Sequence, residues 1–201
     1  MMTRTIFETP AVRTFAKWLI GISFKLSGWR LEGSKPGIDK WVAIGAHHTS
    51  GWDFPLMLAV AFGFDINVRW MGKDSLFRWP WGAFFRYCGG VPVDRSKKQN
   101  LVEQSIEQLK THDRFVIAIA PEGTRKKSTH WKTGFYRIAL GAGVPIVMAF
   151  LDYERKVAGL GPVLMPSGDI DADFEKIRAF YSTVTAKYPD QVGEIVTSPK
   201  Q

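Results

Sequence analysis

The sequence predicts an α/β protein: a single domain with a largely parallel, mixed sheet flanked by helices, plus an N-terminal amphipathic helix. Three observations support this prediction. Short apolar runs of strand length alternate with longer segments of helical periodicity, which is typical of a layered fold with a parallel sheet. The 201 residues are enough for one hydrophobic core, and 45% hydrophobic with 23% charged residues is an ordinary globular composition. The single cysteine, Cys88, excludes a disulfide scaffold.

The first predicted element is a helix that Thr9 can cap and Pro10 can begin. Basic residues recur along one stripe of this helix at Arg13, Lys17 and Lys25, and bulky apolar residues lie away from the stripe. Such a helix can lie in a membrane interface with its basic stripe on lipid head groups. It can equally pack on the core with its lysines in water, so both arrangements stay open on these residues alone.

The remaining elements follow from the length of each apolar run and from its periodicity. The predicted strands are 28–33, 41–46, 66–71, 91–93, 115–120 and 144–151. The predicted helices are 53–62, 98–111, 133–141 and 171–187, with an aromatic-rich helix or turn at 79–87. These elements divide the chain into an N-terminal helix at 1–27, a main domain at 28–190 and a C-terminal tail at 191–201 that we expect to fray.

Charge and aromatic content narrow the kind of partner. The chain has 27 Lys plus Arg against 19 Asp plus Glu, a formal charge of +8, and its pI is near 9.6. A small protein this basic is expected to meet a phospholipid head group, a phosphorylated substrate, an acidic protein or a nucleic acid. The 8 Trp and 14 Phe favour a membrane or ligand surface. No nucleic-acid-binding signature is present, so we predict no nucleic-acid partner and keep a basic nucleic-acid-binding protein as the alternative class.

The N-terminal region also bears on location. Its longest uncharged run, between Lys17 and Lys25, is too short for the roughly 20 apolar residues of a spanning helix. The same region lacks the ordered features of a secretory signal peptide. We therefore expect a peripheral protein on the cytoplasmic side of the membrane.

Polar side chains follow the predicted strand 41–46, at the end of a strand where ligands sit in α/β folds. The segment 47–53 reads HHTSGWD. Ser50 and Asp53 have the S-x-x-D spacing of a helix start, with Ser50 as the cap. A turn here would let the Asp53 carboxylate hold the ring of His48, whose other nitrogen could then take a proton from a hydroxyl.

The same residues have plainer interpretations. Asp53 can simply cap the helix, with His48 as a polar loop residue. A metal site is a third alternative, because His47, His48 and Asp53 are all ligand types. Adjacent histidines splay apart in an extended chain, however, and no H-E-x-x-H motif or Cys cluster accompanies them. We therefore predict no metal.

A second polar segment, PEGTR at 121–125, follows the predicted strand 115–120. Gly123 permits a tight turn and a close approach of ligand to backbone. Arg125 offers a planar, permanently charged fork that suits a phosphate. Glu122 can accept from substrate hydroxyls or pair with Arg125. The plainer alternative is a turn with a surface ion pair.

Taken together, the two segments resemble the glycerolipid acyltransferase family, of the lysophosphatidate (1-acyl-sn-glycerol-3-phosphate) acyltransferase type. The motifs that carry the resemblance are His48-x4-Asp53, GGVPVDR at 89–95, PEGTR at 121–125 and GVPIV at 143–147. Their order and spacing match the family over roughly residues 28–155. One departure is His47, where the family often has Asn.

The resemblance implies transfer of an acyl group from a thioester to a hydroxyl, without an acyl-enzyme. It assigns the general base to His48 and the orientation of that base to Asp53. It assigns substrate binding to Ser50, Lys73, Arg95, Glu122, Gly123, Thr124 and Arg125. Arg95 and Arg125 would hold the acceptor phosphate. Cys88 has no His partner in a recognisable motif and is predicted to be a small, buried core residue.

The resemblance also implies the partners. No metal or redox cofactor is needed, and acyl-CoA or an acyl carrier protein serves as the co-substrate. The expected acceptor is a lysophospholipid at a membrane surface, with lysophosphatidate first and glycerol 3-phosphate or a lyso-aminolipid as alternatives. The N-terminal helix is similar to the membrane-docking segments of this family, which favours its membrane interpretation.

Overall fold

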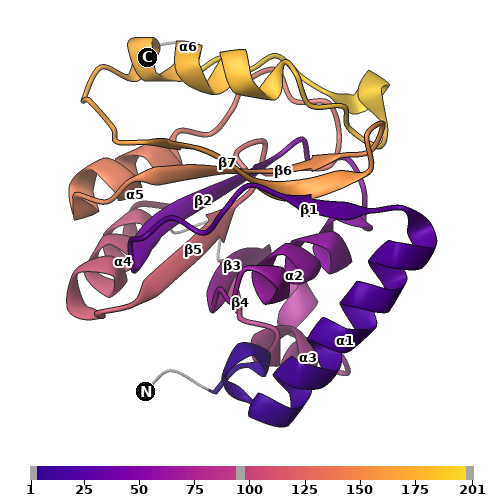
Figure 1. Cartoon of the computed structure of the whole chain (residues 1–201). Helices are drawn as coiled ribbons and strands as arrows, with labels where there is room; N and C mark the ends of the chain where they lie inside the picture. The colour runs from indigo at the N-terminus through magenta and orange to yellow at the C-terminus, as the bar shows by residue number, and fades with distance from the viewer. Residues whose placement is uncertain (1–3, 94–97, 198–201) are drawn as a thin grey trace.

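Within residues 4–93 and 98–197, the part of the chain that the computed structural model describes, seven strands form one sheet (Figure 1). The strands are β1 (Arg30–Glu32), β2 (Lys40–Ala46), β3 (Val68–Lys73), β4 (Gly90–Val93), β5 (Phe115–Ile119), β6 (Ile146–Asp152) and β7 (Val157–Leu164). Their spatial order is β1-β7-β6-β2-β5-β3-β4. The strands from β6 to β4 run parallel, while β7 is antiparallel to β6 and parallel to β1. The predicted largely parallel, mixed sheet is confirmed.

Helices flank the sheet on both faces. They are α1 (Pro10–Ser27), α2 (Asp53–Gly63), α3 (Gly82–Tyr87), α4 (Lys98–Thr111), α5 (Gly134–Ala142) and α6 (Ile170–Tyr181), with short 3₁₀ turns η1 (Ile6–Glu8), η2 (Asp74–Phe77) and η3 (Pro189–Gln191). One apolar core gathers side chains from α4, α5 and α6. The other gathers side chains from η1 and α2, with α1 packed against it.

Strand β2 is the centre of this arrangement. Its apolar run predicts a strand that is buried on both faces. Val42 and Ile44 belong to the first core, and Trp41 and Ala43 to the second. The residues that follow β2 are therefore held at a rigid edge between two packed layers.

Strand β7 is an element that the sequence analysis did not assign, because glycines and a proline interrupt its pattern. Gly159 is required there, since a Cβ would lie 2.0 Å from the Glu32 carbonyl oxygen of the neighbouring β1. Pro162 falls where the register of β7 on β6 shifts, which is a place where a sheet tolerates proline. The antiparallel edge of the sheet was missed for these reasons.

The C-terminal predictions need two corrections. The helix predicted to reach Lys187 ends at Tyr181, because the β-branched run that follows has low helix propensity. The tail expected to fray is packed as far as it is described: Ile195 is buried, and Thr197 pairs with Trp131 in an isolated bridge.

Helix α1 begins at Pro10 with Thr9 at its N-cap, as predicted, although the Thr9 side chain makes no capping hydrogen bond. Arg13 and Lys17 of the predicted basic stripe pair with Asp65, which follows α2, at 3.4 and 2.7 Å. Both side chains stay partly exposed, at 51% and 38%, so the side of the helix that meets a membrane stays a prediction. A second exposed side is apolar, with Phe15, Trp18, Leu19, Ile22 and Leu26 exposed. None of the helices in the described part of the chain combines the length and apolar character needed to cross a membrane.

Candidate active site

The two predicted polar segments meet at one edge of the sheet. Strands β2 and β5 are parallel neighbours, with Ile44 opposite Ile119, so both end at the same level. His48 follows β2, and the segment 121–125 follows β5. Lys73, the last residue of β3, is exposed at the same edge. Segments more than 70 residues apart in the chain are thus brought together, as the carboxyl ends of parallel strands require.

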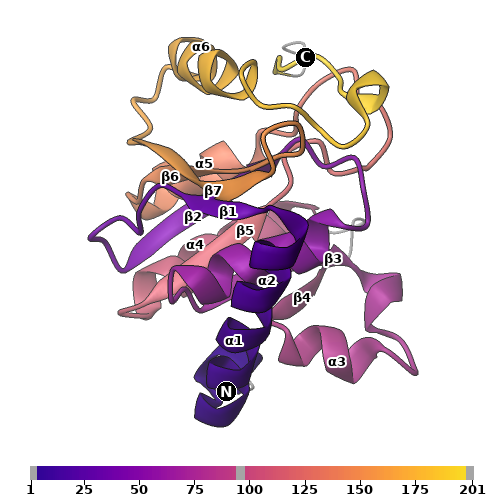
Figure 2. The same cartoon turned by 45° about the vertical axis from the view of Figure 1, so that its right-hand side comes forward.

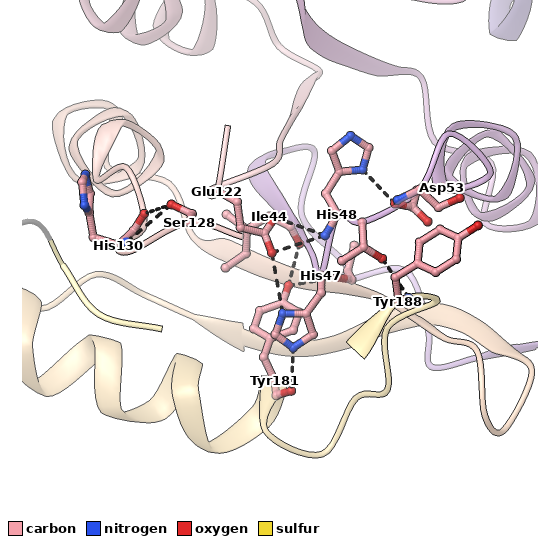
Figure 3. Close-up of polar contacts among 12 residues, drawn as sticks. Ile44, His47, His48, Asp53, Glu122, Ser128, His130, Tyr181 and Tyr188 are labelled. Carbon is pink, nitrogen blue, oxygen red and sulfur yellow. Dashed lines mark hydrogen bonds and ion pairs between the residues drawn. The ribbon is translucent and has the colours of Figure 1, made fainter. Parts of the chain in front are cut away.

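His48 and Asp53 form a hydrogen-bonded pair (Figure 3). The Nδ1 atom of His48 lies 2.9 Å from Asp53 Oδ2. A carboxylate can only accept, so Nδ1 carries the proton and Nε2 is left as an acceptor. Asp53 is buried, whereas the His48 side chain is 33% exposed. A buried carboxylate therefore fixes the tautomer of an imidazole that solvent and a substrate can reach.

The turn before α2 explains how residues five apart can meet. The helix begins at Asp53, with Trp52 at its N-cap, so the predicted cap Ser50 lies in the turn that leads into it. The Ser50 N–H donates to Asp53 Oδ2 at 2.9 Å, and the Trp52 N–H donates to Ser50 Oγ at 3.1 Å. This turn brings the carboxylate back over the ring of His48.

The charge of Asp53 is well stabilised. Burial by itself would raise the pKa of the Asp53 carboxyl. Hydrogen bonds from His48, from the Tyr153 hydroxyl and from the Ser50 amide outweigh that effect and hold the pKa below its usual value. Asp53 is therefore ionised at neutral pH and can stabilise an imidazolium at His48.

Glu122 contacts the same pair through the backbone of His48. Its buried carboxylate accepts from the His48 backbone N–H, with N to O distances of 3.1 and 3.3 Å. The sequence allowed Glu122 to accept from a substrate hydroxyl or to pair with Arg125. Among the described residues it makes no pair with Arg125 and ties the loop after β5 to the backbone of His48 (Figure 3), and its substrate role stays a prediction.

The neighbouring His47 points elsewhere. Its Nε2 lies 3.2 Å from the Tyr181 carbonyl oxygen, and its Nδ1 lies 3.6 Å from Glu122 Oε1. The two histidines thus splay apart, so His47, His48 and Asp53 do not converge as a ligand set. Across residues 4–93 and 98–197, no group of three or more His, Cys, Asp or Glu side chains is arranged to hold a metal ion.

An open cavity of about 650 Å³ lies beside the pair. It is lined by Thr49, Ser50, Gly51, Trp52, Pro55, Arg125 and Tyr188. Lys187 sits over the Trp52 ring at 5.3 Å and over the Tyr188 ring at 5.8 Å. The cavity therefore combines aromatic walls with the exposed guanidinium of Arg125, which makes no ion pair with any residue that the structure describes.

The structure says less about the other predicted binding residues. Gly123 has a left-handed backbone, with φ of 64°, as the tight turn before Arg125 requires. Thr124 is exposed, and its Oγ accepts from the Lys126 N–H at 3.2 Å. Arg95 lies outside the described residues. The binding roles of these residues and of Lys73 stay predictions.

Sequence reasoning missed the aromatic residues of the site, Tyr153 above all. Its hydroxyl donates to Asp53 Oδ1 at 2.6 Å. A signal was available, because Tyr153 follows β6, which is the other parallel neighbour of β2. Trp52 and Tyr188 line the cavity without any motif that would mark them. Cys88 is buried as predicted, and burial raises the pKa of its thiol to about 11, so it stays protonated at neutral pH.

The fold and the site define a class: α/β proteins that hold a His–Asp pair and an arginine-bearing cavity at the carboxyl edge of a parallel sheet. Comparison with known proteins makes this class specific. The Acyltransferase family model matches residues 39–150, more than half of the chain. The chain belongs to the Acyltransferase family.

Two relatives illustrate the match. A 1-acyl-sn-glycerol-3-phosphate acyltransferase of Haemophilus influenzae is 28% identical over an alignment of 152 positions, and the match covers 70% of this chain and 61% of that protein. The chain thus spans less than two thirds of the length of this relative. The crystal structure of PlsC, the 1-acyl-sn-glycerophosphate (LPA) acyltransferase of Thermotoga maritima, shares the fold with a TM-score of 0.59 and 20% identity, over 88% of this chain and 81% of that chain.

Proposed function

We propose that this protein is an O-acyltransferase that moves a fatty acyl group from a thioester to a hydroxyl of a lysophospholipid. The observation that carries the proposal is the His48–Asp53 pair, in which a buried carboxylate fixes the proton on Nδ1 of an accessible imidazole. An alcohol is a poor nucleophile at neutral pH, so its acylation needs such a base.

In the proposed reaction, Nε2 of His48 takes the proton of the acceptor hydroxyl as its oxygen attacks the thioester carbonyl. The imidazolium that forms is stabilised by the ionised Asp53. Collapse of the tetrahedral intermediate breaks the carbon–sulfur bond, and the departing thiolate takes up the proton from His48. The acyl group thus passes directly to the acceptor, and the buried, protonated Cys88 has no part in the reaction.

Lysophosphatidate is the acceptor that we propose, with phosphatidate as the product. Arg125 supports this choice, because its exposed guanidinium lines the cavity beside the pair and suits a phosphate monoester. Both relatives are named as acyltransferases that act on the same acceptor class. The donor is proposed only as an acyl thioester, either acyl-CoA or an acyl carrier protein, and no further cofactor is needed.

We further propose that the protein works at a membrane surface, on its cytoplasmic side. The outer apolar surface of α1 (Phe15, Trp18, Leu19, Ile22 and Leu26) supports this proposal, since contiguous exposed apolar groups mark an interaction site. An aromatic segment after β3 adds to it, with Leu76, Trp79, Trp81 and Phe84 exposed and Trp79 94% accessible. Helices α1 and α3 both lie at the end of the molecule opposite to α6 (Figures 1 and 2). Tryptophan side chains suit the head-group region of a bilayer.

The experiment that tests the function is a panel of donors and acceptors with the purified chain, read by mass spectrometry. Acyl-CoA and acyl carrier protein thioesters are each paired with lysophosphatidate, glycerol 3-phosphate and a lyso-aminolipid in detergent or vesicles. We expect phosphatidate to form fastest and to depend on His48. If another acceptor is acylated faster, the lysophosphatidate assignment is wrong. If no acceptor is acylated, the enzymatic proposal fails.

A further inference from the structure

Three groups donate hydrogen bonds to the Asp53 carboxylate. His48 Nδ1 and the Ser50 amide both donate to Oδ2. The hydroxyl of Tyr153, 100 residues further along the chain, donates to the other oxygen, Oδ1, at 2.6 Å. The carboxylate is therefore held at both oxygens, from the β2–α2 turn on one side and from the end of β6 on the other.

Tyr153 is itself held in place by its backbone and by its ring. Its N–H donates to the Thr185 carbonyl at 2.9 Å, which anchors the residue to the segment after α6. The Trp29 ring packs against its ring at right angles, with centroids 5.2 Å apart. Lys187 lies over the ring at 5.9 Å. A phenol fixed at this many points can act as a rigid donor rather than a loose surface group.

Burial and the adjoining carboxylate also keep the hydroxyl protonated. Burial raises the pKa of Tyr153, and the hydrogen bond to Asp53 raises it further. Tyr153 therefore donates throughout the pH range in which the His48–Asp53 pair would work, and it does not compete with His48 as a base.

We propose that Tyr153 is a positioning residue of the acyl-transfer site, which fixes the rotation of the Asp53 carboxylate so that Oδ2 stays on Nδ1 of His48. The inference deepens the proposed function, because it assigns the support of the same base. A carboxylate held at one oxygen only can swing about its terminal torsion, which is a soft motion. A donor on Oδ1 removes that freedom and also disperses the negative charge of the carboxylate.

Charged and titratable groups from three segments surround the hydrogen bond between Tyr153 and Asp53. His48 and Asp53 lie on the β2–α2 segment, and Glu122 reaches the backbone of His48 from the loop after β5. Lys187 lies over the Tyr153 ring from the segment after α6, and Tyr188 of the same segment interacts with Tyr153 electrostatically. Removal of the phenol hydroxyl leaves each of these charges in place, so its effect on Asp53 can be read separately.

The test is Tyr153→Phe, which keeps the ring and its packing and removes only the donor. We expect kcat to fall about tenfold to a hundredfold, since a hydrogen bond to a charged group is lost, with little change in the acceptor KM. The pKa of Asp53 should rise without this donor, and the more basic carboxylate should hold the imidazolium of His48 more strongly. The acid limb of the pH–rate profile, which reports this coupled pair, should therefore move to higher pH.

Tyr136→Phe is the matched control. The Tyr136 hydroxyl donates to the buried carboxylate of Asp173 at 2.9 Å, away from the site, so this variant loses the same kind of contact. We expect it to cost stability as Tyr153→Phe does, but to leave kcat and the pH–rate profile as in the wild type. A loss of kcat in both variants with unmoved profiles would reduce Tyr153 to a structural role and overturn the inference.

A second measurement does not depend on activity. The Asp53 carboxyl carbon, identified in ¹³C NMR by its absence from Asp53→Asn, should titrate at higher pH in Tyr153→Phe than in the wild type and in Tyr136→Phe. An unmoved Asp53 titration overturns the inference even if acyl transfer is found. A moved titration in a wild-type protein that transfers no acyl group would support the contact and reject the proposed function instead.

Discussion

Two regions of the molecule differ from the usual rule that polar groups are exposed and apolar groups are buried. One is the sheet edge with the His48–Asp53 pair, and the other is the outer apolar surface of α1. At the edge, polar groups are buried: Asp53 and Glu122 are both nearly inaccessible and both accept hydrogen bonds from His48. On α1, large apolar groups are exposed, and Leu26 is 82% accessible. Buried polar groups cost stability unless they are hydrogen-bonded, and contiguous exposed apolar groups mark an interaction site.

The difference shows how the two parts are built. At the buried polar edge, hydrogen bonds join different segments: Asp53 accepts from the β2–α2 turn and from Tyr153, and Glu122 accepts from the backbone of His48. Such a fixed polar arrangement is what a site of chemistry needs. The exposed apolar surface has no such partners among the described residues, and this is the basis of its proposed contact with a membrane. Variants that affect only one of these two regions test whether their roles are separate.

The largest effect is expected for His48→Ala. Loss of the base should lower kcat by about 10²- to 10⁴-fold. The fold should persist, since the ring is partly exposed and Glu122 binds the backbone of residue 48 rather than its side chain. Circular dichroism and thermal unfolding check the fold, and vesicle binding should be unchanged. Near-normal turnover would remove the pair from the mechanism.

Arg125→Ala should come next. If Arg125 binds the acceptor phosphate, its loss should raise the acceptor KM by about 10- to 100-fold with a smaller effect on kcat. The neighbouring Lys126→Ala removes an exposed charge from the same loop and is the matched control. An acceptor KM that changes equally in both variants, or in neither, would argue against a specific phosphate contact.

The membrane proposal is tested by a double variant of the outer apolar surface, Trp18→Ser with Leu26→Ser. Each buried large apolar group contributes about 1.5–3 kcal/mol, so partitioning into vesicles should fall about tenfold or more. Met165→Ser, at an exposed apolar residue just after β7, is the control and should bind as the wild type does. Removal of the whole helix is a weaker test, because α1 also covers the core with Ile20 and Phe24.

The sequence predicted the parts of this molecule whose signals are local. The strand that precedes His48 and the helix that begins at Asp53 were found from runs and spacing. The link between these two side chains was one of three alternatives on spacing alone, and the resemblance to a family selected it. Their meeting with the PEGTR segment followed from the rule that parallel strands end at one edge. These predictions needed only patterns that lie within a few residues of one another.

The features that the sequence did not predict depend on contacts between residues far apart in the chain. Arg13 and Lys17 of α1 pair with Asp65, which lies 48 residues beyond Lys17 in the chain. The position of Glu122 beneath His48 depends on how two loops pack, and the contact of Tyr153 joins residues 100 apart. No periodicity marks such pairs. The resemblance to a family supplied motifs and roles, but not these supporting contacts.

Acid should weaken the fold through Asp53. The pKa of this carboxyl is lowered in the folded chain, so the stability that it contributes is present above its unfolded pKa of about 3.9 and is lost as pH falls through the folded value. The free energy of unfolding should therefore decline more steeply below about pH 4 in the wild type than in Asp53→Asn. Chemical denaturation at a series of pH values measures both slopes. Equal slopes would mean that the donors around Asp53 do not stabilise its charge.

The smallest effect is expected for Lys17→Gln, and it separates two ways of docking α1. If the basic stripe contacts lipid head groups, loss of Lys17 should weaken binding to anionic vesicles. In the structure Lys17 pairs with Asp65 and the apolar side faces outward, so we expect vesicle binding to change less than about twofold. The pair is partly exposed, and its loss should lower the free energy of unfolding by no more than about 1 kcal/mol. A large loss of vesicle binding at unchanged stability would restore the basic stripe as the docking side and remove the contrast between the apolar surface and the polar edge.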